Sequence, residues 1–100
     1  MDGINLILIE RKEQVTKHGR TIEGDVLENN ENQLSLAASW LVIPDTIGCL
    51  DREDIIEDHC PIDWDKSNWE RMVNKTYKER LIIAGALIAA EIDRIQALEE

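Results

Sequence analysis

Two tryptophans stand beside a run of cationic residues in the second half of the chain. Trp64 and Trp69 flank Lys66, and residues 66–80 contain five Lys or Arg residues against two acids. A flat indole can stack on a nucleobase while neighbouring cations hold its phosphate. Both indoles could equally close a hydrophobic core, as large aromatics do in small domains. The sequence favours neither interpretation for Trp64 and Trp69. Trp40, in contrast, lies within a helical pattern and is expected in the core.

A second positive cluster lies between residues 11 and 20. A small anion could bind near such clusters. A long polyanion such as nucleic acid could not bind, because it needs an extended basic surface and the formal net charge of the chain is −10. The same negative charge disfavours binding to anionic membranes. We therefore predict a small-molecule site without a catalytic residue, a cofactor or a metal. The predicted ligand-binding residues are Arg11, His18, Arg20, Trp64, Trp69, Lys78, Arg80 and Glu91.

Carboxylates on two helices support a competing hypothesis, a metal-dependent nucleotide hydrolase. Small all-α nucleotide pyrophosphohydrolases hold magnesium between an E-x-x-E helix and an E-x-x-D helix. Glu10 and Glu13 match the first pattern, but Arg94 follows Glu91 where the second requires an acid. Acidic oxygens must converge on the metal, and one acid of this pattern is missing. We therefore keep the enzyme as the alternative to a binding protein. It would use Glu10, Glu13, Glu91 and Asp93.

Glu91 lies between alanines and Ile92 on the last helical segment. A carboxylate in such a position is expected to be partly buried and therefore paired. Its candidate partners are Arg11, Arg80 and Arg94 of a neighbouring subunit, and an interhelical salt bridge is favoured over a ligand or metal contact.

The cysteines give no sign of a metal site. Cys49 and Cys60 form no C-x-x-C pair, and their spacing from His18 and His59 matches no standard zinc site. The N-terminal residues lack the basic segment of a signal peptide. We expect both thiols to be reduced and the protein to be cytoplasmic.

Hydrophobic periodicity predicts an all-α fold in one domain of residues 1–100, with three main helices and one short helix. The first spans Gly3 to about His18, with Gly19 as its C-cap, and residues 20–29 look turn-like. The second begins at Asn30 and stops before Pro44. The short helix opens with Ser67 and runs through Val73, and the long helix opens with the Thr76–Glu79 capping box. Residues 45–65 are the least defined; 51–58 could form a helical turn or two around Ile55 and Ile56, and 60–64 looks extended.

The long C-terminal helix is apolar around most of its circumference. One stripe is Leu81, Gly85, Ile88, Ile92 and Ile95; the other is Ile83, Leu87 and Ala90. A helix with two apolar stripes needs cover on two sides, and a short chain can take the second cover from another copy of itself. We predict a homo-oligomer formed through this helix, with small residues such as Gly85 allowing close approach and the ligand bound at a subunit junction.

Several short motifs occur in an order that resembles a family of small phage and prophage proteins. The matching residues are Glu10-Arg11-x-x-Gln14, His18-Gly19, Asp25, Gln33-Leu34-x-x-Ala37-Ala38 and Arg80-Leu81-x-x-Ala84-Gly85-Ala86-Leu87-Ile88-x-Ala90-Glu91-Ile92-x-Arg94. Cys60-Pro61-Ile62-Asp63-Trp64 stands where the family tends to have Trp-Pro-Trp. The resemblance implies a viral accessory protein acting in the cytoplasm of an infected bacterium.

The leading hypothesis is accordingly an anti-defence protein that binds and sequesters a small nucleotide-derived signalling molecule. A third possibility is an inhibitor that blocks a host protein through its acidic face. Residues 51–65 carry seven acids against one arginine, and such a face could mimic nucleic acid.

Overall fold

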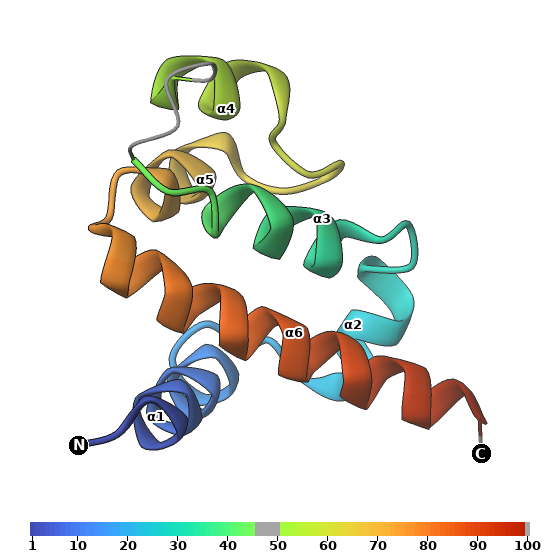
Figure 1. Ribbon diagram of the computed structural model, residues 1–100. Coiled ribbons are helices and arrows are strands. Elements are labelled where there is room, and N and C mark those ends of the chain that lie inside the picture. Colours follow the sequence, from blue (N-terminus) through green and yellow to red (C-terminus); the bar gives the residue numbers. More distant parts are fainter. Residues whose placement is uncertain (46–50, 100) are drawn as a thin grey trace.

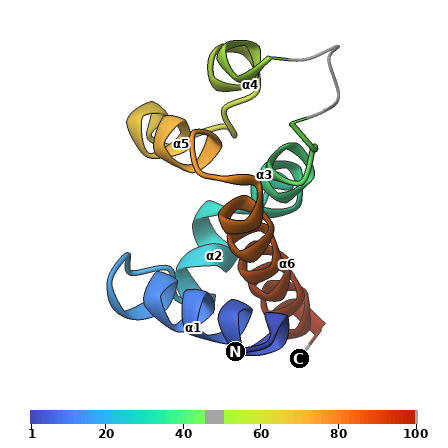
Figure 2. The ribbon, with the colours of Figure 1, turned by 60° about the vertical axis from the view of Figure 1, so that its left-hand side comes forward.

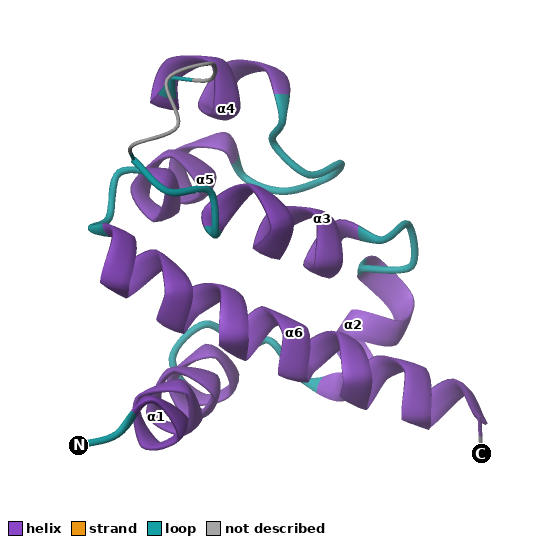
Figure 3. Cartoon of the chain, viewed as in Figure 1, coloured by secondary structure: helices purple, strands orange, loops and turns teal. Residues whose placement is uncertain are grey.

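The structure, a computed structural model, describes residues 1–45 and 51–99. Every regular element in that part of the chain is a helix (Figure 3), which confirms the predicted all-α class. Cys49 lies outside the described residues. The helices are α1 (Gly3–Thr16), α2 (Ile22–Glu28), α3 (Gln33–Leu41), α4 (Arg52–Asp58), α5 (Lys66–Val73) and α6 (Tyr77–Glu99).

Helix α6 is the central element of the fold. It crosses the molecule between α1 and α2 on one side and α3 on the other (Figure 1), and its most extensive contacts are with these three helices. The predicted inner stripe of Ile83, Leu87 and Ala90 is buried against α3, as expected. Each fully buried leucine contributes about 1.5–3 kcal/mol. The buried apolar core comprises Leu34, Ala37, Ala38, Leu41, Ile55, Ile56, Trp69, Val73, Ile83, Ala84, Leu87 and Ala90.

The other apolar stripe of α6 is largely exposed in a single chain. Leu81, Ile88, Ile92 and Ile95 keep 39%, 48%, 51% and 42% of their surface accessible. Figure 2, which looks closer to the α6 axis, shows α1 and α2 to one side of the helix and α3 above it. None of the described helices is long and apolar enough to cross a membrane.

Gly85 belongs to a contact within the chain. A Cβ at this position would lie 2.6 Å from Cδ1 and 2.9 Å from Cγ1 of Ile7 on α1. A side chain at this position would therefore force Ile7 or α1 to shift. The sequence pattern assigned Gly85 to an interface between subunits. In the structure Gly85 instead allows α1 to pack closely against α6 within one chain.

The structure contains two helices beyond the four predicted. Residues 20–29 were expected to be turn-like but include α2, whose first turn is capped by Thr21 Oγ1 accepting from the backbone N–H of Gly24 at 3.0 Å. Asp51 caps α4 in the same way by accepting from Asp54 N at 2.9 Å. Both helices have only seven residues, so tertiary contacts rather than intrinsic propensity must hold them.

Two predicted helix starts are shifted. Asn30 does not open α3; the chain passes through a left-handed residue at Asn32 and the helix begins at Gln33. Ser67 does not cap α5, because Asp65 accepts from Asn68 N at 3.1 Å and Ser67 only adds a hydroxyl bond to the same carboxylate. The ionised carboxylate is the stronger acceptor at a helix N-terminus.

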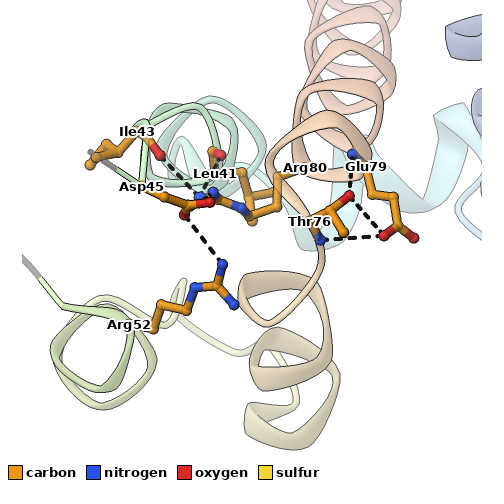
Figure 4. Close-up of polar contacts among 7 residues, drawn as sticks. All are labelled: Leu41, Ile43, Asp45, Arg52, Thr76, Glu79 and Arg80. Atoms are coloured by element: carbon orange, nitrogen blue, oxygen red, sulfur yellow. Dashed lines mark hydrogen bonds and ion pairs between the residues drawn. The ribbon is translucent and has the colours of Figure 1, made fainter. Parts of the chain in front are cut away.

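The predicted start of α6 is confirmed, whereas the C-cap of α1 is Lys17 and the predicted cap, Gly19, lies two residues further on. Gly19 adopts a left-handed φ of 66°, and Arg20 N donates back to Gln14 O at 2.9 Å, which closes the end of α1. At the start of α6, Glu79 N donates to Thr76 Oγ1 at 3.2 Å and Thr76 N to Glu79 Oε1 at 3.3 Å (Figure 4).

Candidate ligand-binding site

A groove between α1 and α5 collects charged side chains and has a volume of about 980 Å³. The two helices lie beside the N-terminal half of α6 (Figure 1). Its lining includes three carboxylates, Glu10 and Glu13 from α1 and Glu70 from α5. An equal number of Lys and Arg side chains comes from α5 and the loops, so both kinds of charge face the same space. The groove residues used below are Glu10, Gln14, His18, Arg20, Arg71 and Lys75. We call this feature the α1–α5 groove.

Gln14 is the one fully buried polar residue of α1, at 2% exposure. Its Nε2 donates to Glu10 Oε2 at 3.5 Å, and its Oε1 has no hydrogen-bond partner. A buried carbonyl oxygen without a donor costs roughly 1–3 kcal/mol. Gln14 also lines the groove, so a bound molecule would satisfy this oxygen if a small local shift of the neighbouring side chains exposed it.

Glu10 shares this environment. Burial raises the pKa of the Glu10 carboxyl, and the neighbouring Glu13 adds to the rise, while Gln14, His18 and Lys75 oppose it. A carboxyl with a raised pKa takes up a proton more readily than an exposed glutamate does.

Arg20 lines both the groove and a second cavity, and Trp64 lines the second cavity. The Arg20 guanidinium carbon lies 4.5 Å from the centroid of the Trp64 ring, which is a cation–π geometry. Trp64 was expected in extended chain, but residues 61–64 form a turn in which Trp64 N donates to Pro61 O at 3.1 Å and Asp63 has a left-handed φ of 66°. Aspartate tolerates that conformation, and the turn directs Trp64 toward α2.

The second cavity, with a volume of about 510 Å³, contains Asp25 and is called the Asp25 cavity below. Trp64 Nε1 donates to Asn29 Oδ1 at 2.8 Å, and Asn29 Nδ2 donates to Asp25 Oδ1 at 2.7 Å. Asp25 is 2% exposed and its Oδ2 has no partner. Burial raises the pKa of Asp25, against the effects of Asn29, Arg11 and Arg20. His18 and Arg20 border both cavities.

Arg80 does not reach either cavity. It is 3% exposed and lies at the C-terminal end of α3 (Figure 4). Its Nη1 donates to the carbonyl oxygens of Leu41 and Ile43 at 3.3 and 3.0 Å, and its Nη2 donates to Asp45 at 2.5 Å. Arg80 therefore satisfies the free carbonyls at a helix end. Lys78 is exposed and also lies outside the lining of both cavities.

Trp69 is a core residue rather than a surface platform. It has no exposed surface, and its Nε1 donates to the carbonyl of Ile55 at 3.0 Å. Its ring meets Trp64 edge-on, with centroids 6.2 Å apart and planes at 73°. Trp69 thus supports the position of Trp64.

The two remaining predicted residues are held by ion pairs. Arg11 donates to Asp93 Oδ2 and to the carbonyl of Arg20, both at 3.3 Å. Glu91 pairs with Arg94 of its own helix, and both side chains are nearly buried. The expected salt bridge of Glu91 thus exists, but it lies within one helix rather than between helices or subunits.

The carboxylates of the competing hydrolase hypothesis do not converge. Asp93 and Glu91 each have an arginine partner on the α6 side, whereas Glu10 and Glu13 line the α1–α5 groove. Among residues 1–45 and 51–99 there is no group of three or more His, Cys, Asp or Glu side chains that could hold a metal ion. Within that same part of the chain, the structure gives the hydrolase hypothesis no support.

Most residues that line the two cavities were not predicted as ligand contacts, among them Gln14, Asp25, Arg71 and Lys75. Gln14 and Asp25 occur in polar stretches, where hydrophobic periodicity carries no signal. Both belong to the motifs of the resemblance described above, which was the one available indication. Comparison of the chain with protein-family models, with curated proteins and with solved structures finds no significant match.

Proposed function

We propose that the protein binds and sequesters a small nucleotide-derived molecule, with its phosphate in the α1–α5 groove. The observation that carries this proposal is the buried, unpaired Oε1 of Gln14 in a groove that also presents His18, Arg20, Arg71 and Lys75. The amide supports recognition of a polar N–H or O–H group on the ligand, and the cations support binding of its phosphate.

The size and charge of the groove favour a small ligand. Its volume of about 980 Å³ is near the upper end of the range for small-molecule sites. The chain as a whole has a net charge of −10, so a polyanion extending beyond the local cations would meet repulsion. A mononucleotide or small cyclic nucleotide needs only the local cations.

The described side chains favour binding over turnover. Glu91 and Asp93 are engaged by arginines. Burial raises the pKa of the Cys60 thiol, whose Sγ lies 3.7 Å from the carbonyl oxygen of Trp64. A thiol with a raised pKa is a poor nucleophile at neutral pH. Sequestration requires only the contacts of the groove.

The biological setting follows from the resemblance to small phage and prophage proteins. In the proposed setting, the protein acts in the cytoplasm of an infected bacterium and lowers the free concentration of a nucleotide signal used in defence. No cofactor enters this proposal. Two tests separate the binding step from its biological consequence: ligand recovery from purified protein, and protection of a phage in a host whose defence uses the signal.

The binding test compares two substitutions that remove the same charge. Isothermal titration with a panel of mononucleotides, cyclic dinucleotides and ADP-ribose should identify a ligand, and heat should release it unchanged from the purified protein. Lys75→Gln should then weaken binding about tenfold, as loss of one charge-assisted contact would. Lys12→Gln is the matched control, because Lys12 is exposed on α1 and does not line the groove. If no panel member binds, or if both variants bind as wild type, the proposal fails.

A further inference from the structure

The Asp25 cavity differs in chemistry from the groove it adjoins. It contains four carboxylates, whereas its only cations are those that it shares with the α1–α5 groove, His18 and Arg20. Such a lining repels phosphate and attracts hydrogen-bond donors. The carboxylates are Asp25, Glu28, Asp63 and Asp65.

The unpaired oxygen of Asp25 is fixed in place by its neighbours. Asp25 Oδ1 accepts from Asn29, and the amide oxygen of Asn29 is already used by Trp64 Nε1. The amide therefore cannot turn to serve Asp25 Oδ2 without losing the tryptophan bond. Arg20 lies over the Trp64 ring and Arg11 is engaged with Asp93 and the Arg20 carbonyl. In the part of the chain that the structure describes, Asp25 Oδ2 has no donor.

We propose that the Asp25 cavity receives the base of the nucleotide and that an exocyclic amino group of the base donates to Asp25 Oδ2. This inference rests on the proposed function, because it takes the phosphate to lie in the α1–α5 groove. The lining of the Asp25 cavity is acidic, whereas the carboxylates of the α1–α5 groove are matched by an equal number of Lys and Arg side chains, so the phosphate is better accommodated in the groove. His18 and Arg20, which border both, lie at the junction between base and phosphate.

The test uses ligand pairs that differ by one amino group. AMP, GMP and CMP are each titrated against the analogue in which hydrogen replaces the exocyclic amino group, and ribose 5-phosphate serves as a probe without a base. At least one amino-bearing nucleotide should bind about tenfold more tightly than its analogue, the factor expected for one hydrogen bond to a charged acceptor. Asp25→Asn should abolish that difference, with folding checked by circular dichroism.

The outcomes separate the two proposals. If every analogue binds as tightly as its parent while ribose 5-phosphate also binds, the phosphate site stands and the base assignment is overturned. If neither the nucleotides nor ribose 5-phosphate bind, both proposals fall. The wild-type comparison decides the question even if Asp25→Asn unfolds the protein.

Discussion

Replacing Gly85 by alanine tests how closely α1 must approach α6. Alanine is favoured over glycine within a helix by about 1 kcal/mol. The added Cβ, however, would lie 2.6 and 2.9 Å from two side-chain carbons of Ile7. Ile7 is β-branched and cannot turn aside freely, and overpacking of this kind costs about 1–3 kcal/mol. Since two atoms must move, we expect a net loss of about 1 kcal/mol in the free energy of unfolding.

Urea unfolding followed by far-ultraviolet circular dichroism measures this change. Gly3→Ala is the control, because a Cβ at Gly3 meets nothing within 4 Å, and it should stay within about 0.5 kcal/mol of wild type. Ile7→Ala removes the obstructing carbons, so in that background Gly85→Ala should become stabilising by up to about 1 kcal/mol. A Gly85→Ala protein as stable as wild type, or an equal effect in both backgrounds, would refute the steric explanation.

Three further substitutions test other parts of the fold. Arg80→Met should lower the free energy of unfolding by about 2–4 kcal/mol, because the carbonyls of Leu41 and Ile43 lose their donor. Urea unfolding measures this free energy. A loss below about 1 kcal/mol would contradict the structural role given to Arg80. Thr76→Ala should cost about 1 kcal/mol in the same assay by removing the cap of α6, and no measurable loss contradicts the capping role. Burial raises the pKa of Asp25, so the folded state binds more protons than the unfolded state between the two pKa values and stability falls as pH rises through that window. Asp25→Asn should therefore melt at a higher temperature than wild type near neutral pH, with the difference shrinking in acid; a constant difference at all pH values would contradict this.

Local features of the fold were predictable because their causes are local. The Thr76–Glu79 box, the glycine end of α1 and the buried face of α6 each depend on residues within one or two turns. Helix α2 was missed because the stretch around it is polar, with its only buried residue a carboxylate, Asp25. Its packing against α6 compensates for the weak local signal.

The candidate site was predictable only in part. His18, Arg20 and Trp64 were named from the sequence, and the structure brings them together in the lining of the Asp25 cavity, where Arg20 lies over the Trp64 ring. Arg80 looked equally suited to phosphate from its charge and position. Arg80 is instead buried and donates hydrogen bonds to backbone carbonyls, because the fold places the end of α3 against it.

By itself, the sequence determined that this protein is helical, where α1 ends and α6 begins, and that α6 has more apolar surface than one short chain can cover. These properties follow from hydrogen bonds and side-chain spacing within a helix. Only the tertiary structure decided which polar groups are free to bind a ligand. Gln14 and Asp25 each line a cavity and keep one oxygen without a hydrogen-bond partner. The Arg80 guanidinium, in contrast, already donates to backbone carbonyls. That distinction depends on contacts between residues far apart in the chain, which no local spacing encodes.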